Sequence, residues 1–252
     1  MDGYFLTHRG KVRSRNEDAG GIFYNADGQM LAIVADGMGG HQAGDVASDM
    51  AASLIQGKWE KVTKMEIPGE LEEWMSKTIA ELNASILDYA LKHPQHEGMG
   101  TTVVIAVGTE EFITIAHIGD SRGYLLNANG LAQITEDHSL VNELVRSGQI
   151  SKEDAEHHPR KNILLKALGT EQGVTEDVQT LSWDKGDQIL LCSDGLTNKV
   201  VDAELKDVLN TSQDIEKIGN KLIELANERG GEDNITLAIL RHTFSHEGGG
   251  GS

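Results

Sequence analysis

The sequence predicts an α+β fold in which helices cover the faces of antiparallel β-sheets. Short apolar runs are joined by short turns, which favours strands that pair with their neighbours in the chain. Helical stretches come in blocks and do not alternate with every strand, which disfavours a parallel sheet. The 252 residues contain only three prolines and no internal Ser/Pro/Gly-rich linker, which indicates a single domain.

The first third of the chain predicts three strands followed by two long helices. The strand-like runs cover residues 4–8, 21–24 and 31–35. Over residues 42–62, apolar residues recur at intervals of three and four, which is the spacing of one helix face. A second stripe of this kind covers 68–93 and begins with a proline, which is tolerated in the first turn of a helix. We interpret both stripes as core-facing.

The rest of the chain predicts a hairpin, a flap and further strands and helices. Asn129-Gly130 is a strong signal for the hairpin turn. Residues 139–169 are polar and interrupted, with short helices expected at 139–148 and 151–157, so this segment is expected to lie over a site as a flap. We expect strands at 101–107, 111–118, 123–126, 131–134, 178–181, 188–192 and 235–241, and helices at 203–209 and 215–228.

Composition disfavours several classes of protein. With 22 Lys and Arg against 40 Asp and Glu, the net charge is −18, which would repel nucleic acid and anionic membranes. No apolar stretch approaches the ~20 residues of a membrane helix, and the N-terminus lacks a signal pattern, so we expect a cytoplasmic protein without membrane insertion. The lone Cys192 lies in an apolar run and is interpreted as an inert core residue. Residues 243–252 end in a Gly-Gly-Gly-Gly-Ser unit and are interpreted as an added linker.

Four apolar runs border an aspartate, and this recurrence predicts a metal site. Asp36, Asp120 and Asp194 follow such runs, each beside a glycine, and Asp233 precedes another. A single Asp-Gly pair is more often an ordinary turn. Strands are stiff, however, and if their ends converge the four carboxylates form an all-oxygen cage for hard divalent cations. Two cations ~3.5–4 Å apart can acidify a shared water and hold the oxygens of a phosphoryl group.

The available ligands also select the kind of ion. No Cys-x-x-Cys pair or His-Glu-x-x-His motif is present, so zinc is not indicated. Carboxylates, carbonyls and waters suit magnesium, manganese or calcium. Residues 13–18 place arginines and acids together, and an arginine can bind phosphate oxygens while an acid holds metal-bound water. The simpler interpretation of this segment is a solvated charged turn.

Seven short motifs follow one another along the chain. They are Arg13-x-x-Asn16-Glu17-Asp18, Asp36-Gly37-Met38-Gly39-Gly40-His41, Gly98-Met99-Gly100-Thr101-Thr102, Gly119-Asp120-Ser121-Arg122, Asp137-His138-Ser139, Ser193-Asp194-Gly195-Leu196 and Gly231-Glu232-Asp233-Asn234-Ile235-Thr236. In kind and order they resemble the motifs of the type 2C, metal-dependent serine/threonine protein phosphatases, in the form found in Gram-positive bacteria. The resemblance runs from about residue 7 to residue 241, nearly the whole chain.

The resemblance implies a fold and a ligand set. The fold is a sandwich of two antiparallel β-sheets flanked by helices, in one catalytic domain at 1–242 with a flap at about 139–169. Two Mn²⁺ or Mg²⁺ ions would share Asp36, and the carbonyl of Gly37 would bind the second of them. Asp194 and Asp233 would complete the coordination of the first ion, and Asp18 would act on the second ion through water.

The same resemblance implies the chemistry. Asp120, together with Asp194, would hold a third ion as in bacterial members of the family. Arg13 would bind the substrate phosphate. A hydroxide that bridges the two core ions would attack phosphorus directly, so Asp36, Asp194 and Asp233 are the expected catalytic residues.

Some positions depart from the family pattern or have no clear role. His8 stands where relatives usually have aspartate, which puts the anchoring of the first strand in question. Met38 stands where animal members place a histidine proposed as the general acid, so the acid for the leaving group is unassigned. His41 either lies near the phosphate or makes a structural hydrogen bond, and His138 is interpreted as structural.

The resemblance predicts hydrolysis of phosphoserine and phosphothreonine in proteins. The expected partners are phosphorylated proteins, including a membrane-anchored serine/threonine kinase that the enzyme would oppose, and we expect a monomer that binds no nucleic acid. One alternative is a pseudophosphatase that binds phosphoproteins without turnover. Another is a different two-metal hydrolase that acts on nucleotides or pyrophosphate.

Overall fold

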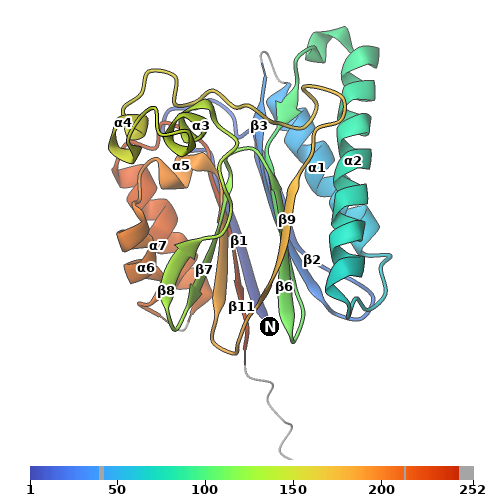
Figure 1. The fold of residues 1–252 in the computed structure, drawn as a ribbon, viewed down its shortest axis with the longest axis vertical. Coiled ribbons are helices and arrows are strands. Elements are labelled where there is room, and N and C mark those ends of the chain that lie inside the picture. Colours follow the sequence, from blue (N-terminus) through green and yellow to red (C-terminus); the bar gives the residue numbers. More distant parts are fainter. Residues whose placement is uncertain (40–42, 213, 244–252) are drawn as a thin grey trace, which may run out of the picture.

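Two antiparallel β-sheets lie face to face, and helices cover the outer face of each sheet (Figure 1). The structure is a computed structural model that describes residues 1–39, 43–212 and 214–243. This arrangement confirms the predicted α+β sandwich. The expected division into one domain with a flap stays a prediction.

The first sheet joins the two ends of the chain. Its first and last strands pair antiparallel over seven residues, from Asp2 opposite Arg241 to His8 opposite Ile235. The predicted Asn129-Gly130 hairpin is present between its last two strands. In spatial order the strands are β1 (Asp2–His8), β11 (Ile235–Arg241), β10 (Gln188–Cys192), β7 (Arg122–Asn127) and β8 (Gly130–Gln133).

The second sheet is built from the middle of the chain and carries the start of the candidate site. Its strand β3 continues through Asp36 to Met38, because its last residues pair with the short strand β4. In spatial order the strands are β2 (Asp18–Tyr24), β3 (Met30–Met38), β5 (Val103–Gly108), β6 (Phe112–Ile118) and β9 (Asp177–Ser182), with β4 (Gly100–Thr101) beside β3.

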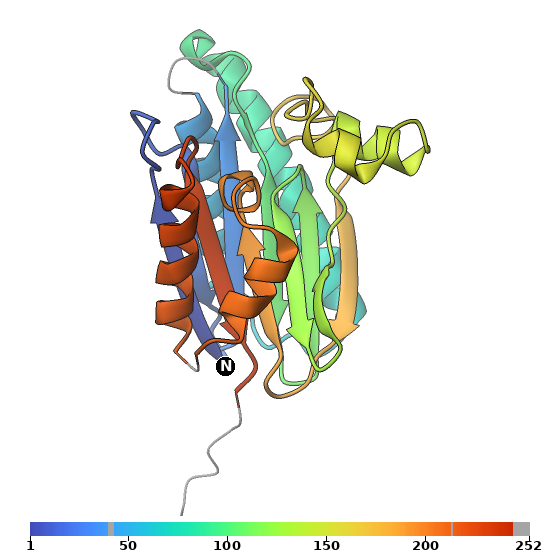
Figure 2. The same ribbon diagram turned by 90° about the vertical axis from the view of Figure 1, so that its left-hand side faces the viewer.

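Helices enclose both sheets and form a projection at one end. The long helices α1 (Gly44–Trp59) and α2 (Pro68–Lys92) cover the second sheet, and α6 (Asp202–Leu209) and α7 (Ile215–Glu228) cover the first (Figure 1). The remaining helices are α3 (Leu140–Arg146) and α4 (Lys152–Glu156) in the expected flap, α5 (Asp194–Thr197), and the 3₁₀ turn η1 (Pro94–His96). Figure 2 shows α3 and α4 projecting from the upper end of the sandwich.

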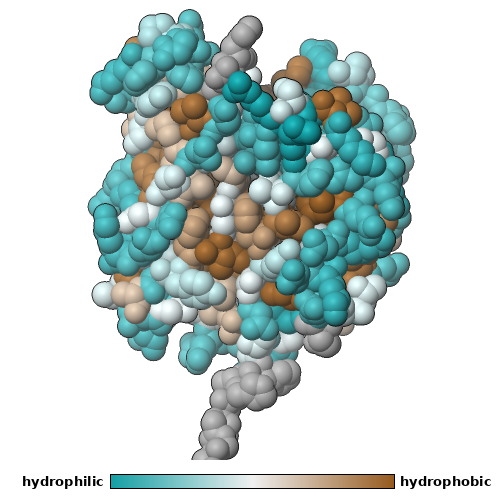
Figure 3. Space-filling model, turned by 180° about the vertical axis from the view of Figure 1, so that it is seen from behind, coloured by the Kyte–Doolittle hydropathy of each residue, from teal (hydrophilic) through white to brown (hydrophobic). Residues whose placement is uncertain are grey.

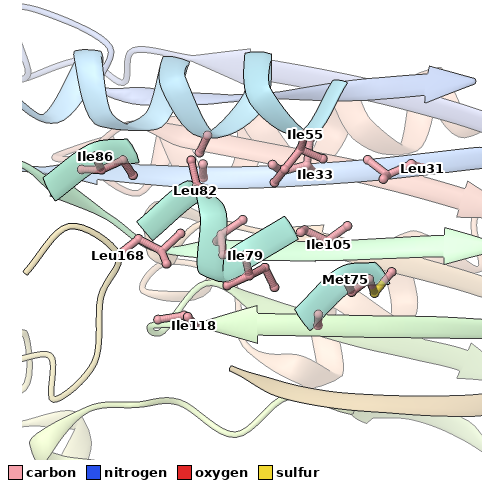
Figure 4. Packing of buried hydrophobic residues seen from close by; sticks show 14 of the residues in the cluster. Leu31, Ile33, Ile55, Met75, Ile79, Leu82, Ile86, Ile105, Ile118 and Leu168 are labelled. Carbon is pink, nitrogen blue, oxygen red and sulfur yellow. The ribbon is translucent and has the colours of Figure 1, made fainter. Parts of the chain in front are cut away.

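Side chains alternate between two cores along each buried strand. In β3, Leu31 and Ile33 face α1 and α2, whereas Ala32 and Val34 face the other sheet. Figure 4 shows the first of these cores, where helix residues such as Leu82 point at the strands. A third core lies between the first sheet and α5, α6 and α7. This period of two fixes which face of each strand is buried and therefore fixes the register of the sheet.

Two further expectations concern single features. Cys192 is fully buried, and burial raises the pKa of its thiol to about 12, so it is the inert core residue that the sequence predicts. Within the described part of the chain, no helix has the length and apolar character needed to cross a membrane. The face shown in Figure 3 is strongly hydrophilic at its upper end and has hydrophobic residues in its middle.

Candidate metal centre

The fold brings the five predicted aspartates to one end of the sandwich. Asp18 and Asp36 are register partners on the neighbouring strands β2 and β3. Asp120 follows β6, Asp194 is the first residue of α5 after β10, and Asp233 lies two residues before β11. The upper end in Figure 2 holds the end of β3, the start of α5 and the α7–β11 loop. Residues from both sheets therefore meet at this end.

Electrostatics places Asp36 at the centre of this group. Burial raises the pKa of Asp36 well above its ordinary value, and the other four aspartates raise it further in the order Asp18, Asp194, Asp120 and Asp233. A carboxyl group that is sensitive to four other carboxyl groups must lie close to all of them. The carboxylates that the sequence places far apart are thus neighbours in space.

Two of the surrounding aspartates are held where their charge is unfavourable. Burial raises the pKa of Asp18 to about 7, even though the Ser193 hydroxyl donates a 2.8 Å hydrogen bond to its Oδ2. The other oxygen, Asp18 Oδ1, is buried and has no hydrogen-bond partner. Burial and the charge of Asp194 likewise raise the pKa of Asp120 to about 7.

These observations test whether the site fits divalent cations. Buried carboxylates without partners are costly unless a cation neutralises them. The donor set consists of carboxylate oxygens with an unpartnered buried oxygen among them, which suits a hard cation such as Mg²⁺ or Mn²⁺. The residues present therefore fit the expected metal centre.

Gly37 allows three segments to approach one another closely beside Asp36. Its N–H donates to the carbonyl of Glu17 (3.0 Å), which ties β3 to the chain just before Asp18. A Cβ at this position would lie 2.1 Å from the Gly44 carbonyl oxygen and 2.4 Å from the Glu17 carbonyl oxygen. Only glycine fits between these two backbone groups.

Arg13 lies at the edge of the same centre. Its guanidinium donates a 2.8 Å bond to Asp233 Oδ2, and about half of its side chain is exposed. On the other side, the Asn198 amide donates to Asp194 Oδ2 at 3.0 Å. The structure thus places the expected phosphate-binding arginine in contact with an expected metal ligand.

Several residues in the motifs have supporting roles that sequence reasoning did not assign. Ser193 holds Asp18 and also accepts a hydrogen bond from the Thr236 N–H (3.0 Å). Thr102 accepts from the Asp36 N–H (3.1 Å) and is hydrogen-bonded to Ser121, next to Asp120 (2.7 Å). Ser193 and Ser121 are each next to a predicted ligand, and Thr102 ends the Gly98–Thr102 motif, so position inside a motif was the available signal.

The positions that depart from the family pattern have separate outcomes. His8 Nδ1 accepts a 2.9 Å bond from the Gly10 N–H, so the end of β1 is anchored in spite of the change from aspartate. Met38 is the last residue of β3. His41 lies outside the described residues. His138 has structural contacts. Its ring Nδ1 accepts a hydrogen bond from the Gly119 N–H (3.2 Å), and its backbone N–H donates to the Gly119 carbonyl (2.9 Å).

A second group of possible ligands lies at the base of the flap. His117, His138 and Asp177 have ligand atoms within 4.8 Å of one another, whereas the five aspartates, all among the described residues, form no such tight group of three. The two imidazole rings are stacked, with centroids 4.7 Å apart and planes 15° from parallel. Lone pairs in two such planes do not converge on one ion, so this group is better explained as packing at the flap base. A cavity of ≈ 620 Å³ opens beside it.

The aspartates are less tightly grouped for a physical reason. Asp233 is turned toward Arg13, and Asp194 is hydrogen-bonded to Asn198. The negative charges around Asp36 repel one another, as their effect on its pKa shows.

The comparisons with known proteins point to one family. Residues 7–237 match the family model described as Protein phosphatase 2C. The chain belongs to the protein phosphatase 2C family. It is similar to the serine/threonine phosphatase stp of Listeria welshimeri, with 49% identity over 98% of both chains. The structure of serine/threonine phosphatase Stp1 from Staphylococcus aureus superposes with a TM-score of 0.91 at 40% identity, covering 95% of this chain and 94% of that one.

A third relative of the 2C family was solved with metal bound. The catalytic domain of the serine/threonine protein phosphatase PstP, in complex with two manganese ions, has a TM-score of 0.84 and 32% identity, covering 96% of this chain and 98% of that one. The family relationship and this manganese complex agree with the oxygen-rich aspartate centre found here.

The metal-free form of this 2C-family protein should lose stability as the pH rises. Burial raises the folded-state pKa values of Asp18 and Asp120 to about 7, against an ordinary value of 3.8, so the folded state binds protons more tightly than the unfolded chain. We expect the melting temperature in EDTA to fall by about 5 °C between pH 5.5 and 7.5. Burial lowers the pKa of His138, which by itself would make stability rise with pH. This is one group, however, against the several carboxyl groups whose pKa values are raised.

Scanning calorimetry in EDTA and in Mn²⁺ at several pH values measures this effect. Mn²⁺ should restore stability most strongly at the higher pH, where the carboxylates are ionised. Asp120→Asn should flatten the profile in EDTA. A melting temperature in EDTA that rises over this pH range would contradict the expectation.

Proposed function

We propose that this protein hydrolyses phosphoserine and phosphothreonine in other proteins with the aid of two Mn²⁺ or Mg²⁺ ions. The chain is a member of a phosphatase family, and the observation that carries the proposal is the meeting of five aspartates around Asp36 with Arg13 at their edge. Carboxylates would hold the ions, and an arginine beside them would hold an anionic substrate.

Each aspartate has a proposed role that agrees with its place in the fold. Asp36 would be shared by both ions because it lies nearest the middle of the group. Asp194 and Asp233 would complete the coordination of the first ion. Asp18 and the Gly37 carbonyl, from the neighbouring strands β2 and β3, would serve the second. When bound, the ions supply charge neutralisation and acidify a coordinated water near neutral pH.

A third ion is proposed at Asp120. This carboxylate follows β6, and its pKa is raised by burial and next by the charge of Asp194, so the two carboxylates lie near each other and are proposed to share a cation. Asp120 is therefore proposed to modulate the centre, while the core pair of ions depends on Asp36.

Arg13 is proposed to bind the phosphate. A guanidinium group presents paired N–H donors that match two phosphate oxygens. In the structure its N–H donates to Asp233, and the exposed half of the side chain leaves it accessible from solvent. A phosphate that arrives at the metal centre would replace Asp233 as its acceptor.

The proposed cellular role is based on the family resemblance. We propose a cytoplasmic, monomeric enzyme that acts on phosphorylated proteins, among them a membrane-anchored serine/threonine kinase whose signals it would reverse. His41 stays a candidate for contact with the phosphate, and the acid for the leaving group is unassigned.

A metal-dependence assay separates the proposed enzyme from a pseudophosphatase. Turnover of p-nitrophenyl phosphate and of a phosphothreonine peptide is measured with Mn²⁺, with Mg²⁺ and with EDTA. Wild type should be active with either cation and inactive in EDTA, and Asp194→Asn should lose activity on both substrates. The matched control Asp207→Asn makes the same chemical change on the exposed side of α6 and should behave as wild type. No turnover with any divalent cation, or turnover that survives EDTA, would reject the proposal.

A further inference from the structure

A short basic loop borders the metal centre in an otherwise acidic protein. We define the basic loop as residues 9–15, which connect β1 to β2 and contain Arg9, Lys11, Arg13 and Arg15. Four of the 22 basic residues in the chain lie in these seven positions, with no acidic residue among them, although the net charge is −18. This loop is thus a local positive surface beside the candidate site.

The basic loop is held in place by the segment that contains Asp233. The side-chain amide of Asn234 donates to the carbonyls of Arg9 (2.9 Å) and Arg15 (2.8 Å), at the two ends of the loop. Its oxygen accepts from the Glu17 N–H (2.8 Å), so every hydrogen-bonding group of this amide except a second lone pair is used. Asn234 therefore fixes the loop next to Asp233.

A second set of contacts fixes the middle of the loop. The Gly231 carbonyl accepts from the N–H groups of Lys11 (2.7 Å) and Val12 (3.2 Å). Gly10 has φ +78°, and a Cβ there would lie 2.1 Å from the Asp233 carbonyl oxygen. Figure 2 shows this loop, in dark blue, beside the red α7–β11 loop. A solvated charged turn would not need such contacts, so the loop presents its side chains from a defined position.

In the part of the chain that the structure describes, two of the four cations have no carboxylate within ion-pair distance. Arg13 is paired with Asp233 at 2.8 Å, and Arg15 is 3.8 Å from Asp45. Among the residues that the structure describes, no carboxylate lies within ion-pair distance of Arg9 or Lys11, and both residues are exposed. Arg9 Nη1 donates to the backbone carbonyl of Ser14 (3.4 Å), which leaves its charge unneutralised, so both charges can act on a ligand that arrives at the centre.

We propose that the basic loop selects phosphorylated segments that carry glutamate or aspartate next to the phosphorylated residue. This inference rests on the proposed phosphatase function. With Arg13 at the phosphate, Arg9 and Lys11 lie within four positions of it and would meet side chains that flank the phosphorylated residue. Charge complementarity at the rim of a site raises the rate of productive encounter and discriminates between partners.

The acidic remainder of the protein strengthens this selectivity. Away from the loop, a negative surface repels an acidic segment and attracts a basic one without orienting it. An acidic segment is consequently guided toward the loop. The opposite preference, for basic segments, would arise if the overall charge of −18 outweighed the loop, and the experiment below distinguishes the two.

The test compares three phosphothreonine peptides of equal length with glutamate, alanine or lysine at the flanking positions. For each enzyme variant, kcat/KM on a peptide is divided by kcat/KM on p-nitrophenyl phosphate, which has no flanking residues, with Mn²⁺ present. For wild type we expect the glutamate peptide to exceed the lysine peptide by about tenfold at low ionic strength, with the difference shrinking in high salt. Lys11→Glu should reduce the ratio for the glutamate peptide by about fivefold.

Lys61→Glu is the matched control. It makes the same change in net charge, and Lys61 is exposed beyond the far end of α1, roughly 24 Å along that helix from the metal centre. Its peptide ratios should equal those of wild type. Equal ratios for the three peptides, a preference for the lysine peptide, or equal effects of the two variants would overturn the inference. Absence of turnover on p-nitrophenyl phosphate itself would instead reject the proposed function.

Discussion

Asp36→Asn should lower phosphatase activity by about a thousandfold or more, whereas Asp120→Asn should lower it by only about tenfold. The difference follows from position. The charges of the other four aspartates all act on Asp36, which is proposed to be shared by two ions, while the charge that acts most strongly on the buried Asp120 is that of Asp194. Removing the charge of Asp36 therefore affects both core ions. Steady-state kinetics over a range of Mn²⁺ concentrations measures kcat and the apparent metal affinity of each variant.

A stability measurement controls for damage to the fold. The contacts that place Asp36 use its backbone: its N–H donates to Thr102 Oγ1, and its carbonyl accepts from the Thr102 N–H (2.9 Å) and from the Thr101 hydroxyl (2.9 Å). Asparagine keeps these contacts and removes a charge that burial opposes. Asp36→Asn should therefore be more stable than wild type in EDTA and gain little stability from Mn²⁺. Equal losses of activity in the two variants would show that Asp36 is not shared by both ions.

Gly37→Ala should destabilise the protein by about 3 kcal/mol and abolish metal-dependent activity. The new Cβ would meet two carbonyl oxygens, of Gly44 at the start of α1 and of Glu17 just before β2. Backbone groups at the start of two elements cannot move aside as a flexible side chain could. Separation of these segments would displace Asp18 and Asp36 together.

Gly57→Ala is the control for this substitution. Gly57 lies within α1, and a Cβ there would have no atom within 4 Å, so alanine should stabilise the helix by about 1 kcal/mol or less. Urea unfolding in EDTA and in Mn²⁺ measures both variants. A Gly37→Ala protein with wild-type stability and metal response would show that the three segments do not need their close approach.

Periodicity predicted the long elements well because they each bury one face. The predicted helix at 215–228 and strand at 235–241 have the bounds of α7 and β11. Short or glycine-rich elements carry no such signal. The helix α5 has four residues and was not expected, and β2 begins at Asp18, before the predicted start at 21. Gly20 gives no strand signal, yet it is needed there, since a Cβ would lie 2.2 Å from the Ile33 carbonyl oxygen.

The charged residues of the candidate site could be predicted from the sequence, but the residues and backbone contacts that hold them in place could not. The residue pattern indicated four aspartates, and the family resemblance added Asp18 and Arg13. Asp36-Gly37 resembles a turn in sequence, so nothing indicated that β3 continues to Met38 by pairing with β4. The threefold use of the Asn234 amide depends on carbonyls from the other end of the chain, which no local pattern reveals.

The pairing of the first strand with the last has a consequence for biosynthesis. Asp18 and Arg13 leave the ribosome well before their partners Ser193 and Asp233 are translated, and Glu17 leaves well before its partner Asn234. A nascent chain therefore holds no complete metal centre until β11 has been made and β1 has joined it. The same dependence means that a cut within β1 or β11 should disable the protein, so dephosphorylation would begin only once β11 has been made and has paired with β1.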